Sequence, residues 1–186
     1  MAKSKFLSHP RASHRVQATA AGPFGTDDGT GGAPNDPSFI LRDARPSDLA
    51  EVCQLERLAF ANPWSIASFQ RELTLPFSRI VVACRQQDGK SCLAGFLCRW
   101  SVADECHILN VAVHPEFRRQ GIARALLTEA IEEARGHNAR FVTLEVRRSN
   151  IAARRLYRKL NFVEQRLRRN YYGFGEDAIV LELKLA

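Results

Sequence analysis

The chain has 186 residues, 45% of them hydrophobic, and a formal net charge of +7. This length suits one domain with a substantial core and is short for two, and the lack of any run of about 18 apolar residues argues against a membrane span. The five cysteines are odd in number and lack C-x-x-C spacing, so we expect reduced core thiols in a cytoplasmic protein and no metal site.

The first 37 residues are rich in Gly, Ala, Ser and Pro and show no hydrophobic periodicity. We expect residues 1–37 to be a disordered tail and residues 38–186 to form the folded domain. The first 26 residues carry basic side chains and no acidic one, which also fits an organelle transit peptide, but no amphipathic stripe supports that reading.

Secondary structure is expected to begin at Phe39. Apolar alternation and helical spacing predict a strand at 39–42, helices at 47–60 and after Ser65, and strands at 79–85, 92–100 and 107–113, with a hairpin turn at 86–89. A helix at 121–135, a strand at 141–146, a helix at 150–160 and strands at 162–168 and 177–183 follow. This order predicts an α/β (α+β) domain with a mixed central sheet and helices on both faces.

The turn between the strand at 107–113 and the next helix is suited to binding an anion. Helix-start N–H groups carry partial positive charge, and Gly121 lets the backbone approach a phosphate. Arg118, Arg119 and Arg124 surround the same point. Residues 118–169 as a whole contain fourteen Lys and Arg against five acidic residues. A solvated basic face accounts for many of these charges, so charge alone does not identify the partner.

The sequence of this turn excludes two common nucleotide-binding loops, since neither G-x-x-x-x-G-K-[ST] nor G-x-G-x-x-G occurs. Instead Arg118-x-x-Gly121-x-Ala123 resembles the acetyl-coenzyme A loop of the Gcn5-related N-acetyltransferases (GNAT), written Q/R-x-x-G-x-G/A. An ordinary connection with solvated arginines is the alternative.

Glu145 is the one carboxylate in the apolar strand at 141–146 and lies near its end, where ligand crevices form in α/β sheets. A carboxylate there is costly unless it is hydrated, paired or used in catalysis. Glu145 is therefore a candidate base, and an ion pair with Arg147 or Arg148 is the alternative.

Asn150 and Tyr157 are seven residues apart and so lie on one face of the predicted helix. A helix cap and a core tyrosine are the structural alternatives for these two residues.

Several separated blocks together resemble the ribosomal-protein-alanine N-acetyltransferases of RimI type within the GNAT superfamily. The blocks are 62–65, 109–113, 118–127, 144–150, 156–162 and Arg168-Arg169-Asn170-Tyr171-Tyr172 followed by Glu176-Asp177-Ala178. Two positions depart from the usual pattern. Ala123 stands at the third glycine position, which the family tolerates, and Asn161 replaces a glycine whose left-handed conformation Asn can also adopt.

The resemblance implies acetyl-CoA as cosubstrate, Glu145 as base, Tyr157 as acid, and a splayed strand pair whose amides at 110–113 face the thioester oxygen. We expect Glu145 and Tyr157 on the same side of the sheet. The implied cofactor contacts are Val111, Ala112, Val113, Arg118, Arg119, Gln120, Gly121, Ile122, Ala123, Arg124, Asn150 and Tyr157. The implied substrate contacts are Trp64, Asn110, Tyr171 and Tyr172.

The resemblance predicts acetylation of a protein N-terminus, most specifically the N-terminal alanine of a small-subunit ribosomal protein, by a monomer with no membrane or direct nucleic-acid contact. Acetylation of a lysine or small amine is the alternative within the superfamily. A noncatalytic module that binds the ribosome or RNA is the alternative from another class.

Overall fold

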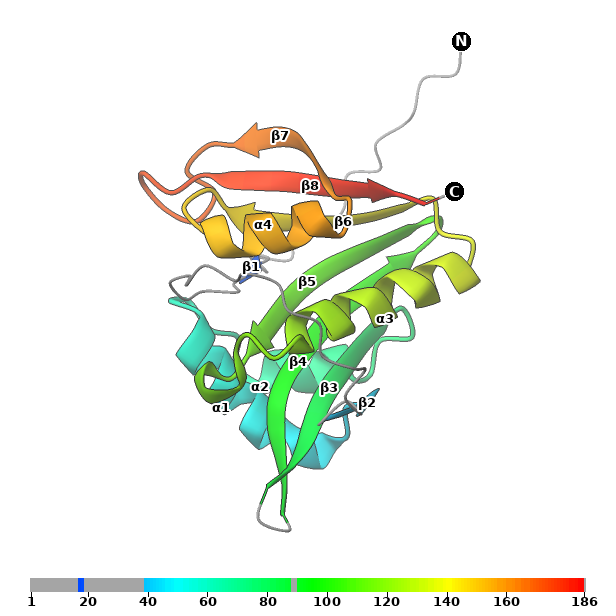
Figure 1. Cartoon of the computed structure of the whole chain (residues 1–186), viewed down its shortest axis with the longest axis vertical. Coiled ribbons are helices and arrows are strands. Elements are labelled where there is room, and N and C mark those ends of the chain that lie inside the picture. The colour runs from blue at the N-terminus through cyan, green and yellow to red at the C-terminus, as the bar shows by residue number, and fades with distance from the viewer. Residues whose placement is uncertain (1–16, 19–38, 88–89, 186) are drawn as a thin grey trace, which may run out of the picture.

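The computed structural model describes residues 17–18, 39–87 and 90–185 (Figure 1). Its first half contains β1 (Gln17–Ala18), β2 (Ile40–Asp43), α1 (Leu49–Ala59), α2 (Ile66–Glu72), β3 (Ser78–Gln87), β4 (Lys90–Val102) and β5 (Glu105–Val113). Its second half contains α3 (Ile122–Gly136), β6 (Phe141–Arg147), α4 (Ile151–Lys159), β7 (Val163–Arg168) and β8 (Ala178–Lys184). Short 3-10 turns at Pro46–Asp48 and Pro115–Phe117 precede α1 and α3.

The strands form one mixed sheet in the order β2-β3-β4-β5-β1-β6-β8-β7. Most neighbours are antiparallel, whereas β5 pairs with β6 in parallel. The predicted mixed sheet is confirmed, and Asn161 has a positive φ of 65° as expected. The hairpin strands β3 and β4 are longer than predicted, and residues 88–89 of the turn lie outside the described residues.

The predicted disordered tail also lies outside the described residues, except for Gln17 and Ala18. These two form the short strand β1, which the composition of the tail did not indicate.

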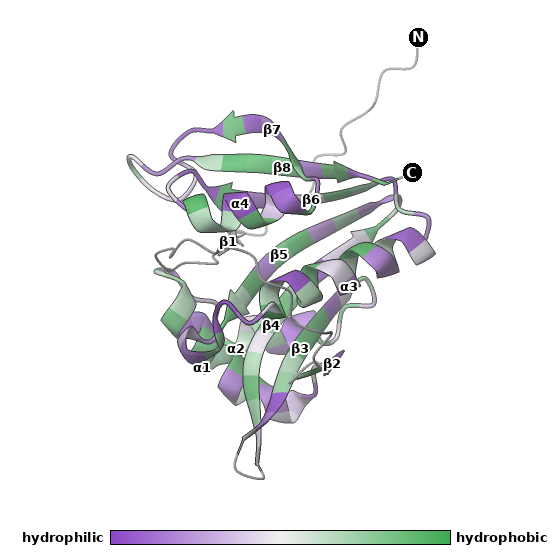
Figure 2. Cartoon of the chain, in the orientation of Figure 1, coloured by the Kyte–Doolittle hydropathy of each residue, from purple (hydrophilic) through white to green (hydrophobic). Residues whose placement is uncertain are grey.

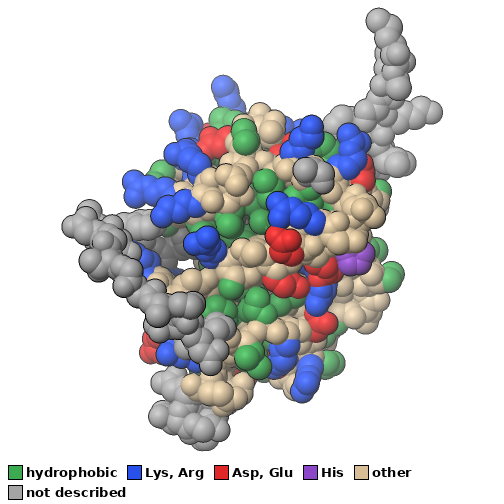
Figure 3. All heavy atoms as spheres, turned by 45° about the vertical axis from the view of Figure 1, so that its right-hand side comes forward, with side chains coloured by type: hydrophobic (Ala, Val, Ile, Leu, Met, Phe, Trp, Pro, Cys, Tyr) green, Lys and Arg blue, Asp and Glu red, His purple; other side chains and the backbone are tan. Residues whose placement is uncertain are grey.

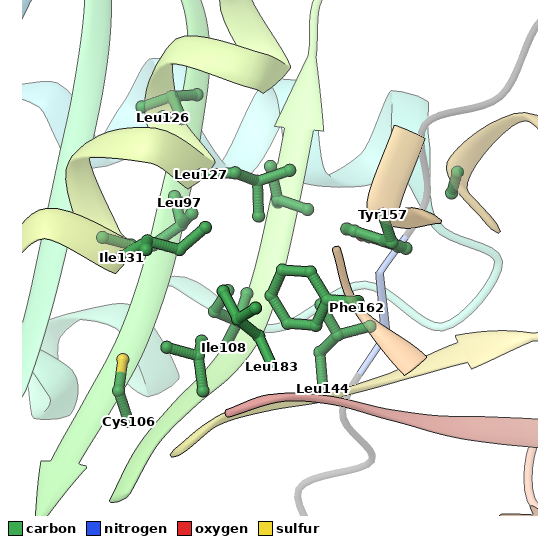
Figure 4. Packing of buried hydrophobic residues seen from close by; sticks show 14 of the residues in the cluster. Leu97, Cys106, Ile108, Leu126, Leu127, Ile131, Leu144, Tyr157, Phe162 and Leu183 are labelled. Atoms are coloured by element: carbon green, nitrogen blue, oxygen red, sulfur yellow. The ribbon is translucent and has the colours of Figure 1, made fainter. Parts of the chain in front are cut away.

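The sheet separates two layers of apolar packing (Figures 1 and 2). On one face α3 and α4 pack against the central strands, and buried residues of this layer include Ile108, Leu126, Leu144 and Tyr157 (Figure 4). On the other face α1 and α2 cover β3, β4 and part of β5, with Val52, Phe69, Phe96 and Leu109 at the centre. Alternation along each strand decides which side chain enters which layer.

The centre of the sheet opens between β5 and β6. Their parallel pairing ends at Ile108 and Leu144. At the same point β5 carries an irregularity opposite β4, because Cys98 pairs with Asn110 and Arg99 with Ile108, which leaves Leu109 as the extra residue. A bulge bends its strand and ends regular pairing, so β5 turns away from β6 beyond this rung. Strand β1 lies in the resulting gap, with Gln17 opposite Asn110 and Ala18 opposite both Val111 and Val146.

All five cysteines are free, and four of them are buried while Cys92 is half-buried. This agrees with the expected core thiols. Among the described residues, no helix combines the length and apolarity that crossing a membrane requires.

Candidate active site

The turn before α3 leads into a helix start that no side chain caps. Gly121 is the N-cap of the 15-residue α3, with φ of 81° and no capping side chain on the helix start. That conformation favours glycine, because a Cβ would strain the backbone there. Ile122 points into the core with 1% exposure, so only its backbone can face a ligand. The predicted anion-binding turn is thus present as a strand-to-helix junction, and its contacts with the cofactor stay a prediction.

Arginines surround this turn, but most of the Lys and Arg side chains of residues 118–169 lie elsewhere. Arg118 is half-buried and donates to the Val113 carbonyl at 3.4 Å, whereas Arg119 and Arg124 are exposed. Many other cations project from α4 and β7, and Figure 3 shows Lys and Arg side chains gathered over the upper part of the molecule, where Figure 1 has these elements. The exposed residues of this group include Arg155, Arg158, Lys159 and Arg166. The solvated-face interpretation therefore accounts for much of the charge.

Tyr157 is fully buried in α4, yet its hydroxyl has no hydrogen-bond partner among the described residues. Its ring packs against Phe162 at 5.8 Å between centroids. Burial raises its pKa, so the phenol stays protonated at neutral pH. A buried hydroxyl without a partner is rare and costly, which suggests that it is kept for a ligand. Asn150 instead caps α4 by accepting from the Ala153 N–H at 3.1 Å.

Glu145 is 3% exposed and is held by two cations from neighbouring strands. Its Oε2 lies 2.9 Å from Nε2 of His107 on β5, and its Oε1 lies 3.1 Å from Nη1 of Arg168 at the end of β7. Burial opposes ionisation, but the hydrogen bond and charge of His107, with help from Arg168, hold the pKa below its usual value. The ion-pair alternative therefore named the wrong partners, because Arg147 and Arg148 do not pair with Glu145.

Glu145 and Tyr157 extend from opposite faces of the sheet, so the expectation that they share one side is wrong. Leu144 and Val146, which flank Glu145, point into the α3/α4 layer together with Tyr157, and alternation turns Glu145 to the other face. The direct pairing of β5 with β6 has ended at this point, and strand β1 lies between the two strands. Tyr172, in the loop before β8, is also buried, and burial together with the negative charge of Glu145 raises its pKa.

The residues predicted to contact substrate are only partly brought together. Tyr172 is buried, its hydroxyl has no partner among the described residues, and Tyr171 packs edge-on against it at 5.1 Å. Trp64 is instead a core residue that packs on Phe69 at 5.3 Å. The amide of Asn110 points inward, to Glu56.

Glu56 on α1 is a buried acid that the sequence analysis missed. Its carboxylate accepts from the Trp64 backbone N–H at 3.0 Å and from the Asn110 amide at 3.0 and 3.1 Å. It thereby ties α1 and the loop before α2 to the bulge of β5. Burial raises its pKa from 4.5 to about 7 despite these hydrogen bonds. In the sequence Glu56 lies within a helical stripe of Leu and Val, and this position could have indicated that its side chain is buried.

We expect Glu56 to make the protein less stable as pH rises. The folded state binds the Glu56 proton up to about pH 7, whereas the unfolded chain releases it near 4.5, so stability present at low pH is lost across this window. The loss is at most roughly 3 kcal/mol. Urea unfolding of wild type and Glu56→Gln at pH 5 and pH 8 measures it, with Glu132→Gln on α3 as control. An equal pH trend in wild type and Glu56→Gln would contradict this assignment.

His107 and Arg168 also escaped prediction as functional residues. Each lies on a strand far from Glu145 in sequence, and only the β5-β6-β8-β7 pairing brings them together. Among the described residues, no group of His, Cys, Asp and Glu has the arrangement of a metal site.

The comparison with family models matches this architecture. The model described as the acetyltransferase (GNAT) family matches residues 49–162, which span α1 to the end of α4. The chain belongs to the GNAT acetyltransferase family and is an N-acetyltransferase. Enzymes of this family use acetyl-CoA, which is the cosubstrate expected from the sequence.

Among curated relatives, the chain is similar to the [ribosomal protein bS18]-alanine N-acetyltransferase of Escherichia coli K12. The two are 40% identical over 146 residues, which cover 75% of this chain and 93% of the relative. An N-alpha-acetyltransferase of Sulfurisphaera tokodaii is 31% identical over 160 residues, covering 79% of this chain and 93% of that protein. The resemblance to RimI-type enzymes is thus confirmed.

Solved structures of N-acetyltransferases share the fold of this chain. The crystal structure of the Escherichia coli ribosomal-protein-S18-alanine N-acetyltransferase superposes with a TM-score of 0.71 at 35% identity, covering 80% of this chain and 94% of that one. Arabidopsis thaliana NAA60 in complex with a bisubstrate analogue gives a TM-score of 0.73 at 25% identity, covering 78% and 97%. NAA60 with acetyl-CoA, at 24% identity, shares the fold with a TM-score of 0.72.

Proposed function

We propose that this enzyme transfers the acetyl group of acetyl-CoA to the N-terminal alanine of ribosomal protein bS18. The observation that carries the chemistry is the opening between β5 and β6, with the Tyr157 hydroxyl on one face and the Glu145 carboxylate on the other. The substrate is suggested by the 40% identical relative, whose name specifies this protein and this residue.

The residues around the opening supply acid–base chemistry from two directions. The α-ammonium of a peptide has a pKa of about 8 and must lose a proton before it attacks. Glu145, ionised at neutral pH, accepts that proton on its own face. Tyr157, protonated at neutral pH, donates to the departing thiolate on the α4 face.

Backbone groups hold and polarise the acetyl donor in this proposal. The amides at the start of α3, with Gly121 as N-cap, receive the pyrophosphate. The bulged segment 110–113 of β5, freed from β6, offers N–H groups to the thioester oxygen. Asn150 contributes by fixing the start of α4 and so the position of Tyr157.

Mass spectrometry of a synthetic peptide that carries the bS18 N-terminus, incubated with acetyl-CoA and the purified enzyme, tests the proposal. We expect one acetyl group on the α-amine. The same peptide with a blocked α-amine and free lysines should stay unmodified. Acetylation of the blocked peptide, or of small polyamines alone, would support the lysine or small-amine alternative instead.

The proposal includes a monomeric enzyme in the cytoplasm that has no need for nucleic acid. Binding of ribosomal RNA without acetyl transfer would favour the binding-module alternative.

Strand β1 should compete with the acetyl donor. Gln17 and Ala18 pair with Asn110 and Val111. These two residues belong to the backbone that we propose to contact the thioester of acetyl-CoA. A competing internal segment raises the apparent Kd, which equals the intrinsic Kd divided by the fraction of molecules in which the segment is not bound. Ala18→Pro removes a backbone N–H from β1, so we expect acetyl-CoA to bind about three- to tenfold more tightly by calorimetry. Ala18→Ser, which keeps the backbone N–H, serves as control, and unchanged or weaker binding by Ala18→Pro would contradict the competition.

A further inference from the structure

His107 occupies the position from which a proton on Glu145 can leave the protein. It precedes Ile108 on β5, and Glu145 follows Leu144 on β6, so the two side chains lie diagonally across the last β5–β6 rung. Both project to the face away from α3 and α4. Their contact of 2.9 Å joins a carboxylate that is 3% exposed to an imidazole that is 34% exposed.

Arg168 fixes the other half of the carboxylate. Nη1 of Arg168 lies 3.1 Å from Oε1 of Glu145, and the other carboxylate oxygen, Oε2, contacts His107. Other charged or titratable groups near this pair are Arg166 on β7, Arg147 on β6 and Tyr172 in the loop before β8. Strand alternation also places Glu105 on β5 and Glu182 on β8, which is opposite Thr143, on this face of the sheet. The His107 imidazole contacts the Glu145 carboxylate and is itself 34% exposed, so it links this buried carboxylate to solvent.

The reaction makes such an exit necessary. Acetylation of an ammonium group yields an amide, a thiol and one net proton. If Tyr157 supplies the thiol proton and is reprotonated in the same cycle, one proton remains to be discharged from the Glu145 side. A carboxylate buried at 3% exposure has little direct contact with water, and two cations disfavour its protonated form.

We propose that His107 is a proton-relay residue: its imidazolium releases a proton to solvent and then takes from Glu145 the proton that came from the substrate ammonium, which restores the starting pair. This inference rests on the proposed function for its substrate. Because His107 acts through Glu145, it is a positioning and relay residue and does not touch the reacting atoms. The alternative is a purely structural contact that holds β5 to β6.

Chemical rescue distinguishes a relay from a structural contact. We expect His107→Ala to lower kcat about tenfold at pH 7, with KM for acetyl-CoA unchanged, and added imidazole to restore much of the loss. The wild type and His137→Gln, altered at the exposed end of α3, should not respond to imidazole. Unchanged kcat in His107→Ala, or a loss that imidazole does not recover, would overturn the relay.

A second measurement needs no turnover. Carbon NMR of the Glu145 carboxyl in wild type and His107→Gln should show a higher Glu145 pKa in the variant, because the main lowering interaction is lost. An unchanged titration would show that the contact does not form in solution and would overturn the proposal. If wild type leaves the bS18 peptide unmodified, the proposed substrate fails, while this titration still decides whether His107 and Glu145 are coupled.

Discussion

Replacement of Tyr157 by phenylalanine should slow acetyl transfer by about 100-fold or more in kcat while leaving the fold intact. The hydroxyl is the proposed donor to the departing thiolate, and general acid catalysis contributes about 10²- to 10⁴-fold. KM for acetyl-CoA should change little, because the pyrophosphate contacts at Gly121 remain. Steady-state kinetics with the alanine peptide measures both constants.

Stability provides the control for this variant. The Tyr157 hydroxyl is buried without a partner among the described residues, so its removal should leave the free energy of unfolding unchanged or raise it by about 1 kcal/mol. A variant that is slower and equally or more stable would identify the hydroxyl as functional. Full activity, or a loss of activity that parallels a loss of stability, would contradict the role as acid.

Glu145→Gln should lower kcat by about 10²- to 10³-fold, because glutamine cannot accept the ammonium proton. The effect should shrink as pH rises past the pKa of the peptide amine, about 8, because the substrate then arrives deprotonated. Measurement of kcat/KM from pH 6 to pH 10 tests this dependence. The carboxylate itself is ionised over that whole range, because His107 and Arg168 lower its pKa.

The matched control is Glu164→Gln on β7, which removes an exposed carboxylate that pairs with Arg154. It should retain wild-type kinetics. A pH-independent loss in Glu145→Gln would assign Glu145 to holding Arg168 and His107 in place, with another group as base.

Local patterns predicted the elements of this fold because each depends on neighbouring residues. The stripe of α3, the cap at Asn150 and the left-handed Asn161 follow from the sequence and are present in the structure. The exact strand ends and the strand β1 were not predictable in this way. Gln17 and Ala18 are too few to show a hydrophobic pattern, and they form a strand because they pair with β5 and β6 where those two strands separate.

Candidate site residues could be proposed from the sequence, whereas their arrangement in space could not. Glu145 was proposed from its position in a strand and Tyr157 from the family resemblance, but the side of the sheet that each faces depends on strand alternation and on the packing of α4. His107, Arg168 and Glu56 depend on contacts between elements that are distant in sequence, 38 residues in the case of His107 and Glu145. A single sequence gives no direct signal for such contacts.

The central claim is that acetyl donor and peptide meet through the opening between β5 and β6. A crystal structure with a bisubstrate analogue, coenzyme A joined to an alanine-initiated peptide, tests it most directly. We predict the coenzyme on the α3/α4 face near Gly121 and Tyr157, the peptide on the face of Glu145 and Tyr172, and the linking atoms between the two strands with β1 displaced. Both halves bound on one face, with β1 still paired to Asn110 and Val111, would contradict this account.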